Sequence, residues 1–451
     1  MKRREFLKLR LRALFPIVLA AVLLAALGIY GCLKGRSAGR YNLILISIDT
    51  LRADRLGAYG YARDTSPNLN AFAEKGVLFR HVVAECSWTL PSHVTMLTGL
   101  FPSTHGATHP ALKPGPDTEF LAEILRAEGY RTIGHTEGGY VGAEYGFGRG
   151  FEFFDDTRRG LPAILEEAAA QIREFSPDDR YFCFLHTYDV HCPYTPSEPY
   201  AEMFQTEDAQ FIDTRWRCGN PHYNRMVLSE GQVRFLSNAY DASIREADEH
   251  LGRFIQFLET SGVLDNTVVV VTSDHGEEFR EHGQIGHERT LYREVLMVPL
   301  IILAPGLTPM RVDTPVGLVD LTPTILDLLG LPVPSTMEGE SLLPLATREP
   351  GTDPNSGTRI SELQWQLFLR SVMTPKWHLI LNLRTDEEKL FAVVNDPLEG
   401  QDLSAVNEKE VSQLLAVLER HRDGRQQRTP EPLDRVTPKQ RELLRSLGYI
   451  N

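Results

Sequence analysis

The chain of 451 residues has little cysteine, and its basic residues are outnumbered by acidic ones. No two cysteines form a Cys-x-x-Cys pair or a zinc-finger spacing, which argues against a structural zinc module and a disulfide framework. The five are Cys32, Cys86, Cys183, Cys192 and Cys218. The sequence leaves open one disulfide among the last three. With 47 basic and 60 acidic residues the net charge is −13, which argues against nucleic acid as the main partner.

One long uncharged run stands out near the N-terminus. Residues 13–33 carry no charge, and at ~1.5 Å per residue a helix of this length just spans a bilayer. Six Lys or Arg residues precede the run, which predicts a cytoplasmic N-terminus and a chain body outside the cytoplasm. The stretch Arg3-Arg4-Glu5-Phe6-Leu7-Lys8 also resembles a twin-arginine export signal. An anchor helix and a cleaved signal both remain open, so residues 1–40 are set apart from the fold.

From residue 41 onward, short apolar runs alternate with helical patterns. Continuous runs rich in β-branched residues are typical of strands buried on both faces of a mostly parallel sheet. They lie at 42–48, 181–185, 267–273 and 298–303. A helix is expected from Ser66-Pro67 to Gly76, and a long one after the capping box at Ser229–Gln232. We predict an α/β domain over 41–350 and a smaller α+β subdomain over 351–451, with strands at 377–383 and 388–394 and a helix near 407–422.

Carboxylates and imidazoles follow three of the expected strands. Asp49 follows the first, Asp274 and His275 follow 267–273, and His186, Asp189 and His191 follow 181–185. A single Asp after a strand is more often a helix or turn cap. Ligands in open α/β sheets bind at the carboxyl ends of the strands, so the convergence predicts a site for one divalent cation. An imidazole ligand favours manganese or zinc over calcium or magnesium.

A hydroxyl stands just before an expected helix over 91–98. Pro91 suits the first turn of that helix and Gly99 suits the position after its end. Thr89 precedes Pro91 by two residues, and its hydroxyl could cap the helix. The same place presents free N–H groups and positive partial charge, which would help a threonine to act as a nucleophile beside a metal ion. By local pattern both interpretations stand.

Several stretches together resemble the sulfatase family of the alkaline-phosphatase superfamily, from about residue 41 to the C-terminus. "NLILISIDTLRADRLGAYGY" is similar to its N-terminal signature, and "TLPSHVTMLTGLFPSTHG" to its nucleophile motif Cys/Ser-x-Pro-Ser-Arg-x-x-x-x-Thr-Gly. "SDHGEEFREHGQIGHERTLYREVLMVPLII" resembles its second metal motif, "LHTYDVHCPYTP" the segment with a substrate-side histidine, and "LFAVVNDPLEGQDLS" its C-terminal strand and turn. The resemblance implies a three-layer α/β/α fold with a mostly parallel sheet.

The resemblance also implies roles for individual residues. It implies metal ligation by Asp49, Asp274 and His275, and it makes Thr89 both the nucleophile and a fourth metal ligand. His191 and His287 would lie near the leaving group or the anionic oxygens. The family points to calcium, whereas His275 favours manganese or zinc.

The departures from the family pattern are informative. Position 89 is Thr, whereas the usual nucleophile is a Cys or Ser that becomes formylglycine, and Cys86 lacks the following x-Pro. His93 stands where the motif has Arg, and an imidazole cannot bind an anion through two parallel hydrogen bonds as a guanidinium does. Thr50 replaces a second metal-binding Asp, His275 replaces Asn, and His287 falls near a usual Lys. The spacing of Asp189 and His191 matches no second metal triad.

The sequence therefore predicts a metal-dependent hydrolase that cleaves sulfuric or phosphoric esters through Thr89. His93, His191 and His287 are expected to provide hydrogen bonds and proton transfer. One alternative is an extracytoplasmic transferase that passes a phospho group to a lipid or glycan, and another is a non-catalytic ligand-binding domain. The expected partners are an anionic ester and a membrane, the latter through the N-terminal helix, and the sequence does not define the oligomeric state.

Overall fold

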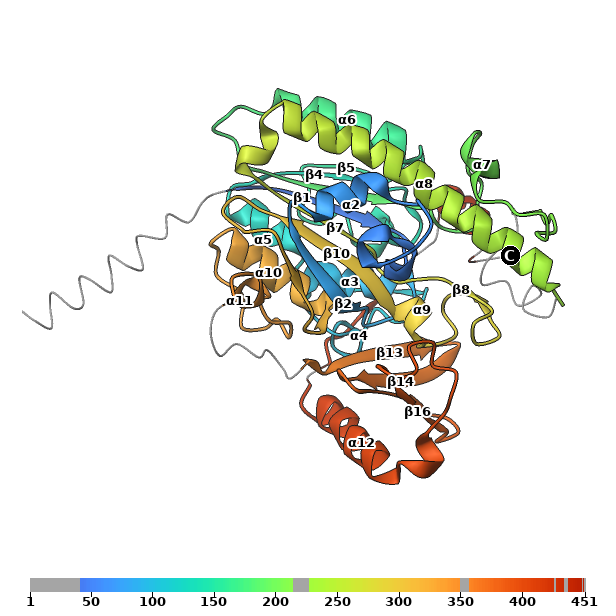
Figure 1. The fold of residues 1–451 in the computed structure, drawn as a ribbon. Coiled ribbons are helices and arrows are strands. Elements are labelled where there is room, and N and C mark those ends of the chain that lie inside the picture. The colour runs from blue at the N-terminus through green and yellow to red at the C-terminus, as the bar shows by residue number, and fades with distance from the viewer. Residues whose placement is uncertain are drawn as a thin grey trace, which may run out of the picture.

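The computed structural model describes residues 41–213, 227–348, 357–425, 427–433, 437–447 and 449. Its centre is a nine-stranded sheet in the order β11-β2-β10-β7-β1-β6-β4-β5, with β12 beside β2 (Figure 1). The middle strands β7 (Thr267–Thr272), β1 (Asn42–Ile48) and β6 (Tyr181–Thr187) are parallel. Only β10 (Met297–Leu303) pairs antiparallel to its neighbours. The predicted mostly parallel sheet is confirmed.

The sheet separates two hydrophobic cores. Side chains of β1 alternate between them, with Leu43 and Leu45 in one core and Ile44, Ile46 and Ile48 in the other, because successive strand residues point to opposite faces. One face is covered by α2 (Pro67–Ala73), α6 (Leu161–Glu174) and α8 (Glu230–Thr260). The other is covered by α3 (Thr89–Thr98), α5 (Leu121–Ala127) and α10 (Leu321–Leu328). This is the expected three-layer α/β/α arrangement.

The remaining strands and short helices complete this body. Strands β2 (Val77–Val83), β4 (Arg131–His135), β5 (Phe153–Asp155), β11 (Met310–Val312) and β12 (Val316–Gly317) extend the sheet. The hairpin of β8 (Glu278–Phe279) and β9 (Ile285–Gly286) follows β7. Short helices are α4 (Pro102–His105), α7 (Tyr200–Met203), α9 (Arg293–Leu296) and α11 (Leu343–Ala346). The capping box predicted at Ser229 begins α8, where Ser229 accepts from the Gln232 backbone N–H.

A second, antiparallel sheet follows in the chain. It consists of β13 (Arg359–Trp365), β14 (Leu367–Met373), β15 (Trp377–Asn382) and β16 (Glu388–Ala392), and α12 (Glu408–Asp423) packs on it. The chain then returns to the first body (Figure 1). There β17 (Glu431–Pro432) pairs with β3 (Leu112–Lys113), and Leu444 of α13 (Pro438–Ser446) joins the first core. The predicted helix and two of the four strands match, whereas β13 and β14 were not anticipated.

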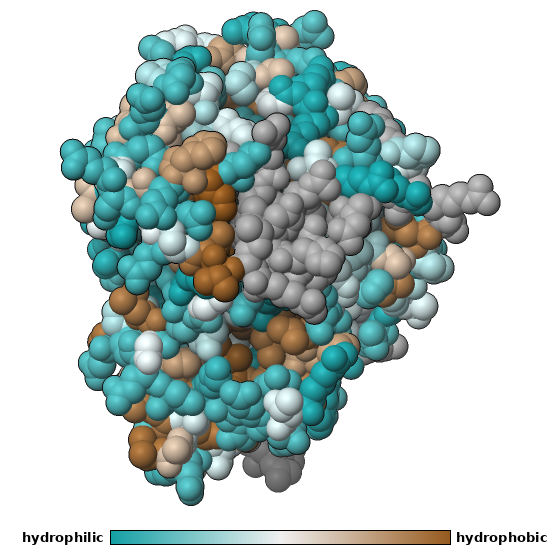
Figure 2. All heavy atoms as spheres, turned by 90° about the vertical axis from the view of Figure 1, so that its right-hand side faces the viewer, coloured by the Kyte–Doolittle hydropathy of each residue, from teal (hydrophilic) through white to brown (hydrophobic). Residues whose placement is uncertain are grey.

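Among the residues that the structure describes, no helix is long and apolar enough to cross a bilayer. The predicted span at 13–33 lies outside them. Figure 2 shows one face of the molecule, on which hydrophilic side chains predominate and apolar ones form scattered groups.

Cys86 and Cys183 are free, buried thiols, and Cys218 lies outside the described residues.

Gly99 ends α3 in the left-handed conformation, with φ at 67°. A Cβ there would be strained and would lie 3.3 Å from Met337 and Pro323. Gly99→Ala should lower the free energy of unfolding by about 1–2 kcal/mol in denaturant titrations. Gly400→Ala is the control, because its added Cβ would meet only the Asp396 carboxylate at 3.9 Å. Equal stability of the two variants would contradict this explanation of the helix end.

Candidate active site

Two carboxylates meet at the carboxyl edge of the central sheet. Asp49 directly follows β1 and donates its backbone N–H to Thr187 O of β6 at 3.0 Å. Asp274 follows β7, and its Oδ1 accepts from the backbone N–H groups of Thr50 and His275 at 3.2 and 2.9 Å. Ligand atoms of Asp49, Asp274 and His275 all lie within 4.8 Å of one another. The neighbouring parallel strands β1 and β7 therefore bring the three predicted metal ligands together.

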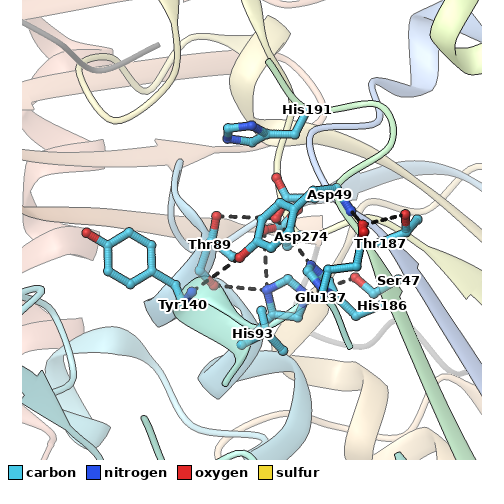
Figure 3. A network of polar contacts seen from close by, with 12 residues as sticks. Ser47, Asp49, Thr89, His93, Glu137, Tyr140, His186, Thr187, His191 and Asp274 are labelled. Carbon is cyan, nitrogen blue, oxygen red and sulfur yellow. Dashed lines mark hydrogen bonds and ion pairs between the residues drawn. The ribbon is translucent and has the colours of Figure 1, made fainter. Parts of the chain in front are cut away.

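Thr89 lies at the start of α3 and points at this group (Figure 3). Its hydroxyl donates to Asp49 Oδ2 at 3.3 Å and lies 3.4 Å from His275 Nε2. The cap position is Trp88, which provides no side-chain hydrogen bond, and the helix begins at Thr89 rather than at Pro91. The helix-cap interpretation of the Thr89 hydroxyl is therefore wrong, because the hydroxyl faces the carboxylates rather than the backbone N–H groups of the first turn.

Two imidazoles lie on the sheet side of the carboxylates (Figure 3). His93, one helical turn after Thr89, places Nδ1 3.0 Å from Thr89 O and 3.3 Å from Asp274 Oδ2, and its Nε2 lies 2.9 Å from Ser47 Oγ. His186 places Nε2 3.4 Å from Asp49 Oδ2, and with Asp49 and His93 it forms a second cluster that could hold a metal. Both nitrogens of His93 are thus engaged behind Thr89, where they can orient Thr89 and Asp274.

Two further imidazoles lie on the other side of Thr89. The rings of His191 and His287 have centroids 5.1 Å apart, and His287 lies 4.5 Å from His275. His287 Nδ1 is 2.9 Å from Glu277 Oε1, and Tyr194 donates to the other oxygen of Glu277 at 2.7 Å. His191 Nδ1 faces the backbone oxygen of Cys192. The predicted substrate-side histidines thus share one space beside the hydroxyl.

Burial and neighbouring charge drive the pKa values of these groups apart. Burial, followed by the charges of Asp274 and Glu277, raises the pKa of Asp49 well above its usual value. Burial opposes ionisation of Asp274 as well, but the imidazoles of His275 and His93 hold its pKa below the usual value. Burial lowers the pKa of His275 to about 4. Asp274 is therefore stabilised as an anion by its imidazole neighbours, whereas Asp49 lacks compensating positive charge in the same buried space.

The two substrate-side histidines shift in opposite directions. Burial, then the charge of His287, lowers the pKa of His191 well below its usual value. Burial also acts to lower the pKa of His287, but the Glu277 carboxylate outweighs it and raises the pKa. His191 is therefore neutral near pH 7, while His287 tends to carry a proton. A neutral histidine is suited to act as a base and a protonated one as an acid.

Some candidates from the sequence have other contacts. Asp189 accepts a hydrogen bond from the backbone N–H of Leu161 at 3.0 Å and so holds the start of α6. This contact agrees with the interpretation of Asp189 as a helix cap rather than a metal ligand. Thr50 donates its hydroxyl to Asp49 O at 2.7 Å and holds the turn after β1. The sequence interpretation also missed Tyr449, whose hydroxyl lies 2.9 Å from Thr89 Oγ1 and 2.9 Å from His191 Nε2. No local pattern marks a tyrosine 360 residues from its partner.

Comparison with known families decides the class. The sulfatase family model matches residues 41–331, and the model of the C-terminal part of N-sulphoglucosamine sulphohydrolase matches 280–427. The chain belongs to the sulfatase family. It is a sulfatase-like ester hydrolase, as the sequence predicted, and this family generally binds a divalent metal ion.

Individual relatives are similar over most of their lengths. The multifunctional alkaline phosphatase superfamily protein PehA of Trinickia caryophylli is 26% identical, over 79% of this chain and 86% of its own. Choline-sulfatase of Rhizobium meliloti is 25% identical, over 82% and 83%. The solved phosphonate monoester hydrolase of Silicibacter pomeroyi superposes with a TM-score of 0.71 at 21% identity, over 88% and 98%. This last likeness shows that the fold is shared.

Proposed function

We propose that the chain hydrolyses a sulfate or phosphate ester through Thr89, with one divalent cation held by Asp49, Asp274, His275 and the Thr89 hydroxyl. The observation that carries the proposal is the Thr89 hydroxyl within 3.3–3.4 Å of Asp49 and His275, at the first residue of a helix. The helix N-terminus adds positive partial charge that favours an alkoxide and an anionic ester. Thr89 acts as it stands, without conversion to formylglycine.

The ligand set fits a cation. Asp49 Oδ1 and Asp274 Oδ2 are buried and accept no hydrogen bond from the described residues, and Asp274 Oδ2 lies 3.3 Å from both His93 Nδ1 and His275 Nε2. His275 Nδ1 lies 2.9 Å from Gly276 O, so Nε2 is the nitrogen that faces Thr89. A second contact of this kind is what orients metal-binding imidazoles. Two carboxylates, an imidazole and a hydroxyl suit manganese or zinc, and calcium is the choice that the family suggests.

The chain's own residues account for the two steps of hydrolysis. A bound divalent cation would supply positive charge that favours the Thr89 alkoxide and stabilises the ester oxygens. The Thr89 oxygen bonds to sulfur or phosphorus, and the bond to the leaving oxygen breaks with its electron pair. Water then attacks the Thr89 ester, the bond to the Thr89 oxygen breaks, and the inorganic acid leaves. A plain threonine cannot expel the group by forming an aldehyde, so this water is required.

The two substrate-side histidines divide the proton transfers. His287, held protonated by Glu277, donates to the leaving oxygen. His191, kept neutral by burial and by His287, accepts the proton of the attacking water. Proton exchange with solvent then returns both histidines to their starting protonation states. His93 contacts Thr89 O, Asp274 and Ser47, so it positions the nucleophile rather than transferring a proton to the ester.

The metal can be tested by removal and by substitution. Chelator-treated protein should gain melting temperature on addition of Mn²⁺, Zn²⁺ or Ca²⁺, because a ligand that binds only the folded state stabilises it. Asp274→Asn should weaken binding of the preferred metal at least about tenfold in calorimetric titrations, since a ligating charge is lost. Asp313→Asn, an exposed carboxylate paired with Arg80, should bind like the parent. A parent protein that responds to none of the three ions would contradict the metal site.

The nucleophile can be tested on aryl sulfate, phosphate monoester, phosphodiester and phosphonate substrates. Thr89→Ala should lower kcat at least about a thousandfold on the preferred ester, and Thr89→Ser should keep part of it because the hydroxyl remains. Thr98→Ala on the same helix is the control, since its hydroxyl bonds Val94 O. If Thr89→Ala turned over every ester as fast as the parent, Thr89 would not be the nucleophile.

The pH–rate profile tests the division of roles. The rate should fall on the acid side as His191 gains a proton, below its usual pKa, and on the alkaline side as His287 loses one, above its usual pKa. Glu277→Gln removes the charge that raises the His287 pKa, so the alkaline limb should move about one unit or more toward acid. Glu281→Gln, whose carboxylate pairs with Arg52, should leave that limb in place. An unmoved limb in Glu277→Gln would refute His287 as the acid.

We propose that residues 13–33 direct the enzyme to a membrane, with its body outside the cytoplasm. The support for this proposal is the uncharged run and the six preceding basic residues. The full chain should sediment with membranes and resist a carbonate wash if the segment is retained, or appear outside the cytoplasm if it is cleaved. Recovery in the soluble cytoplasmic fraction would contradict both forms.

A further inference from the structure

Tyr449 occupies the space in front of the proposed nucleophile. Its hydroxyl lies 2.9 Å from both Thr89 Oγ1 and His191 Nε2, so it bridges the nucleophile and the base. Its ring packs 4.5 Å from Tyr140 and 5.3 Å from His191, measured between centroids. These contacts place a phenol in a slot of aromatic rings, with its oxygen at the reactive end.

The segment that carries Tyr449 consists of α13, Leu447 and Tyr449, and it packs on the first body without contributing a strand to the central sheet. In α13, Leu444 and the following Leu447 are buried, whereas Arg441, Glu442 and Arg445 are exposed. The Tyr449 backbone N–H donates to Leu444 O at 2.9 Å, which turns the chain after the helix back toward the site. The segment is held by the buried Leu444, Leu447 and Gln440 and by a hydrogen bond from Arg158 to the Ser446 hydroxyl at 3.1 Å.

Two glycines make room for this docking. Gly138 and Gly139 have φ of 71° and 60°, and they lie next to the segment. A Cβ on Gly138 would approach Asp156 O to 2.6 Å and Leu443 Cδ2 to 2.8 Å, and one on Gly139 would approach the Tyr188 hydroxyl to 2.8 Å and Leu447 Cδ1 to 3.1 Å. The surface under α13 is therefore shaped to receive the segment closely.

While the Tyr449 hydroxyl contacts Thr89, an arrangement that we call the closed form, there is no room for an ester beside Thr89. The Thr89 side chain has no exposed surface, and His191 has 1%. Sulfur or phosphorus must approach the attacking oxygen to about 3–3.5 Å, which is the space that the Tyr449 oxygen fills. A reacting group and the Tyr449 phenol cannot both adjoin Thr89.

We propose that Tyr449 is an internal competitor of the substrate: its phenol fills the substrate's place beside Thr89 and His191, and turnover requires α13 and Tyr449 to withdraw. The inference rests on Thr89 being the reactive residue. The ring slot beside Tyr140 then receives the part of the substrate that adjoins the ester. The closed form holds the site shut and dry until an anionic ester displaces the phenol.

Competition makes a quantitative prediction. The apparent dissociation constant of any ligand at Thr89 rises by the inverse of the open fraction. Tyr449→Ala, in the metal-loaded full chain, should bind inorganic phosphate or sulfate at least about tenfold more tightly than the parent in calorimetric titrations. KM for the preferred ester should fall by a similar factor while kcat is kept or raised. Tyr449→Phe loses both hydrogen bonds but keeps the ring. Its anion affinity and its KM should therefore lie between those of the parent and those of Tyr449→Ala.

The controls separate this inference from other roles. Glu442→Ala, an exposed position on α13, should match the parent in binding and in KM. If both Tyr449 variants lost kcat with KM and anion binding unchanged, Tyr449 would be part of the catalytic machinery and the competitor role would be overturned. Because binding is measured without turnover, tighter anion binding in Tyr449→Ala would stand even if Thr89→Ala left turnover intact, a result that would overturn only the nucleophile.

Discussion

The repulsion between Asp49 and Asp274 is the constraint on which the rest of the site depends. Their oxygens lie within 4.8 Å of each other with no exposed surface. Two unit charges at that distance repel by on the order of 3 kcal/mol at an effective dielectric constant of ~20, which exceeds the ~1 kcal/mol net contribution of a typical hydrogen bond. The imidazoles of His275 and His93 stabilise the Asp274 carboxylate as an anion, so the uncompensated charge falls on Asp49, and a divalent cation at this point would remove the conflict.

The same constraint organises the four imidazoles around the carboxylates. His93 and His186 lie on the sheet side and touch Asp274 and Asp49, which fixes the carboxylates from behind. His191 and His287 lie beside the Thr89 hydroxyl, where Glu277 separates their protonation states. His93, His275 and His287 thus stand where the family pattern has arginine, asparagine and lysine, and we expect the rate to depend on pH through these imidazoles.

The sequence was sufficient for the parts of the fold that follow from local patterns. The continuous apolar runs of β1 and β7 predicted strands, and the polar residues directly after them predicted where Asp49, Asp274 and His275 meet. The positions of His93 and His186 behind the carboxylates were not predictable from these patterns, because they depend on the rotation of α3 and on where β6 ends. Asp189 shows the same limit, since a carboxylate after a strand serves a helix start as readily as a metal.

Long-range contacts were the other part that sequence patterns could not reveal. Tyr449 reaches Thr89 across 360 positions, and only the packed path of α13 over Gly138 and Gly139 brings them together. The pairing of His287 with Glu277 depends on the turn formed by β8 and β9. Each of these contacts joins segments whose own sequence periodicity carries no mark of the partner.

The account's central claim is that an unmodified Thr89 carries the transferred group. The most direct measurement is mass spectrometry of the Thr89-containing peptide after acid quench during turnover, using His191→Ala to slow the attack of water on the intermediate. We expect threonine at position 89 in the resting protein and a sulfo or phospho group on that residue in the quenched protein. An aldehyde at position 89, or an adduct on another residue with Thr89 unchanged, would contradict the account.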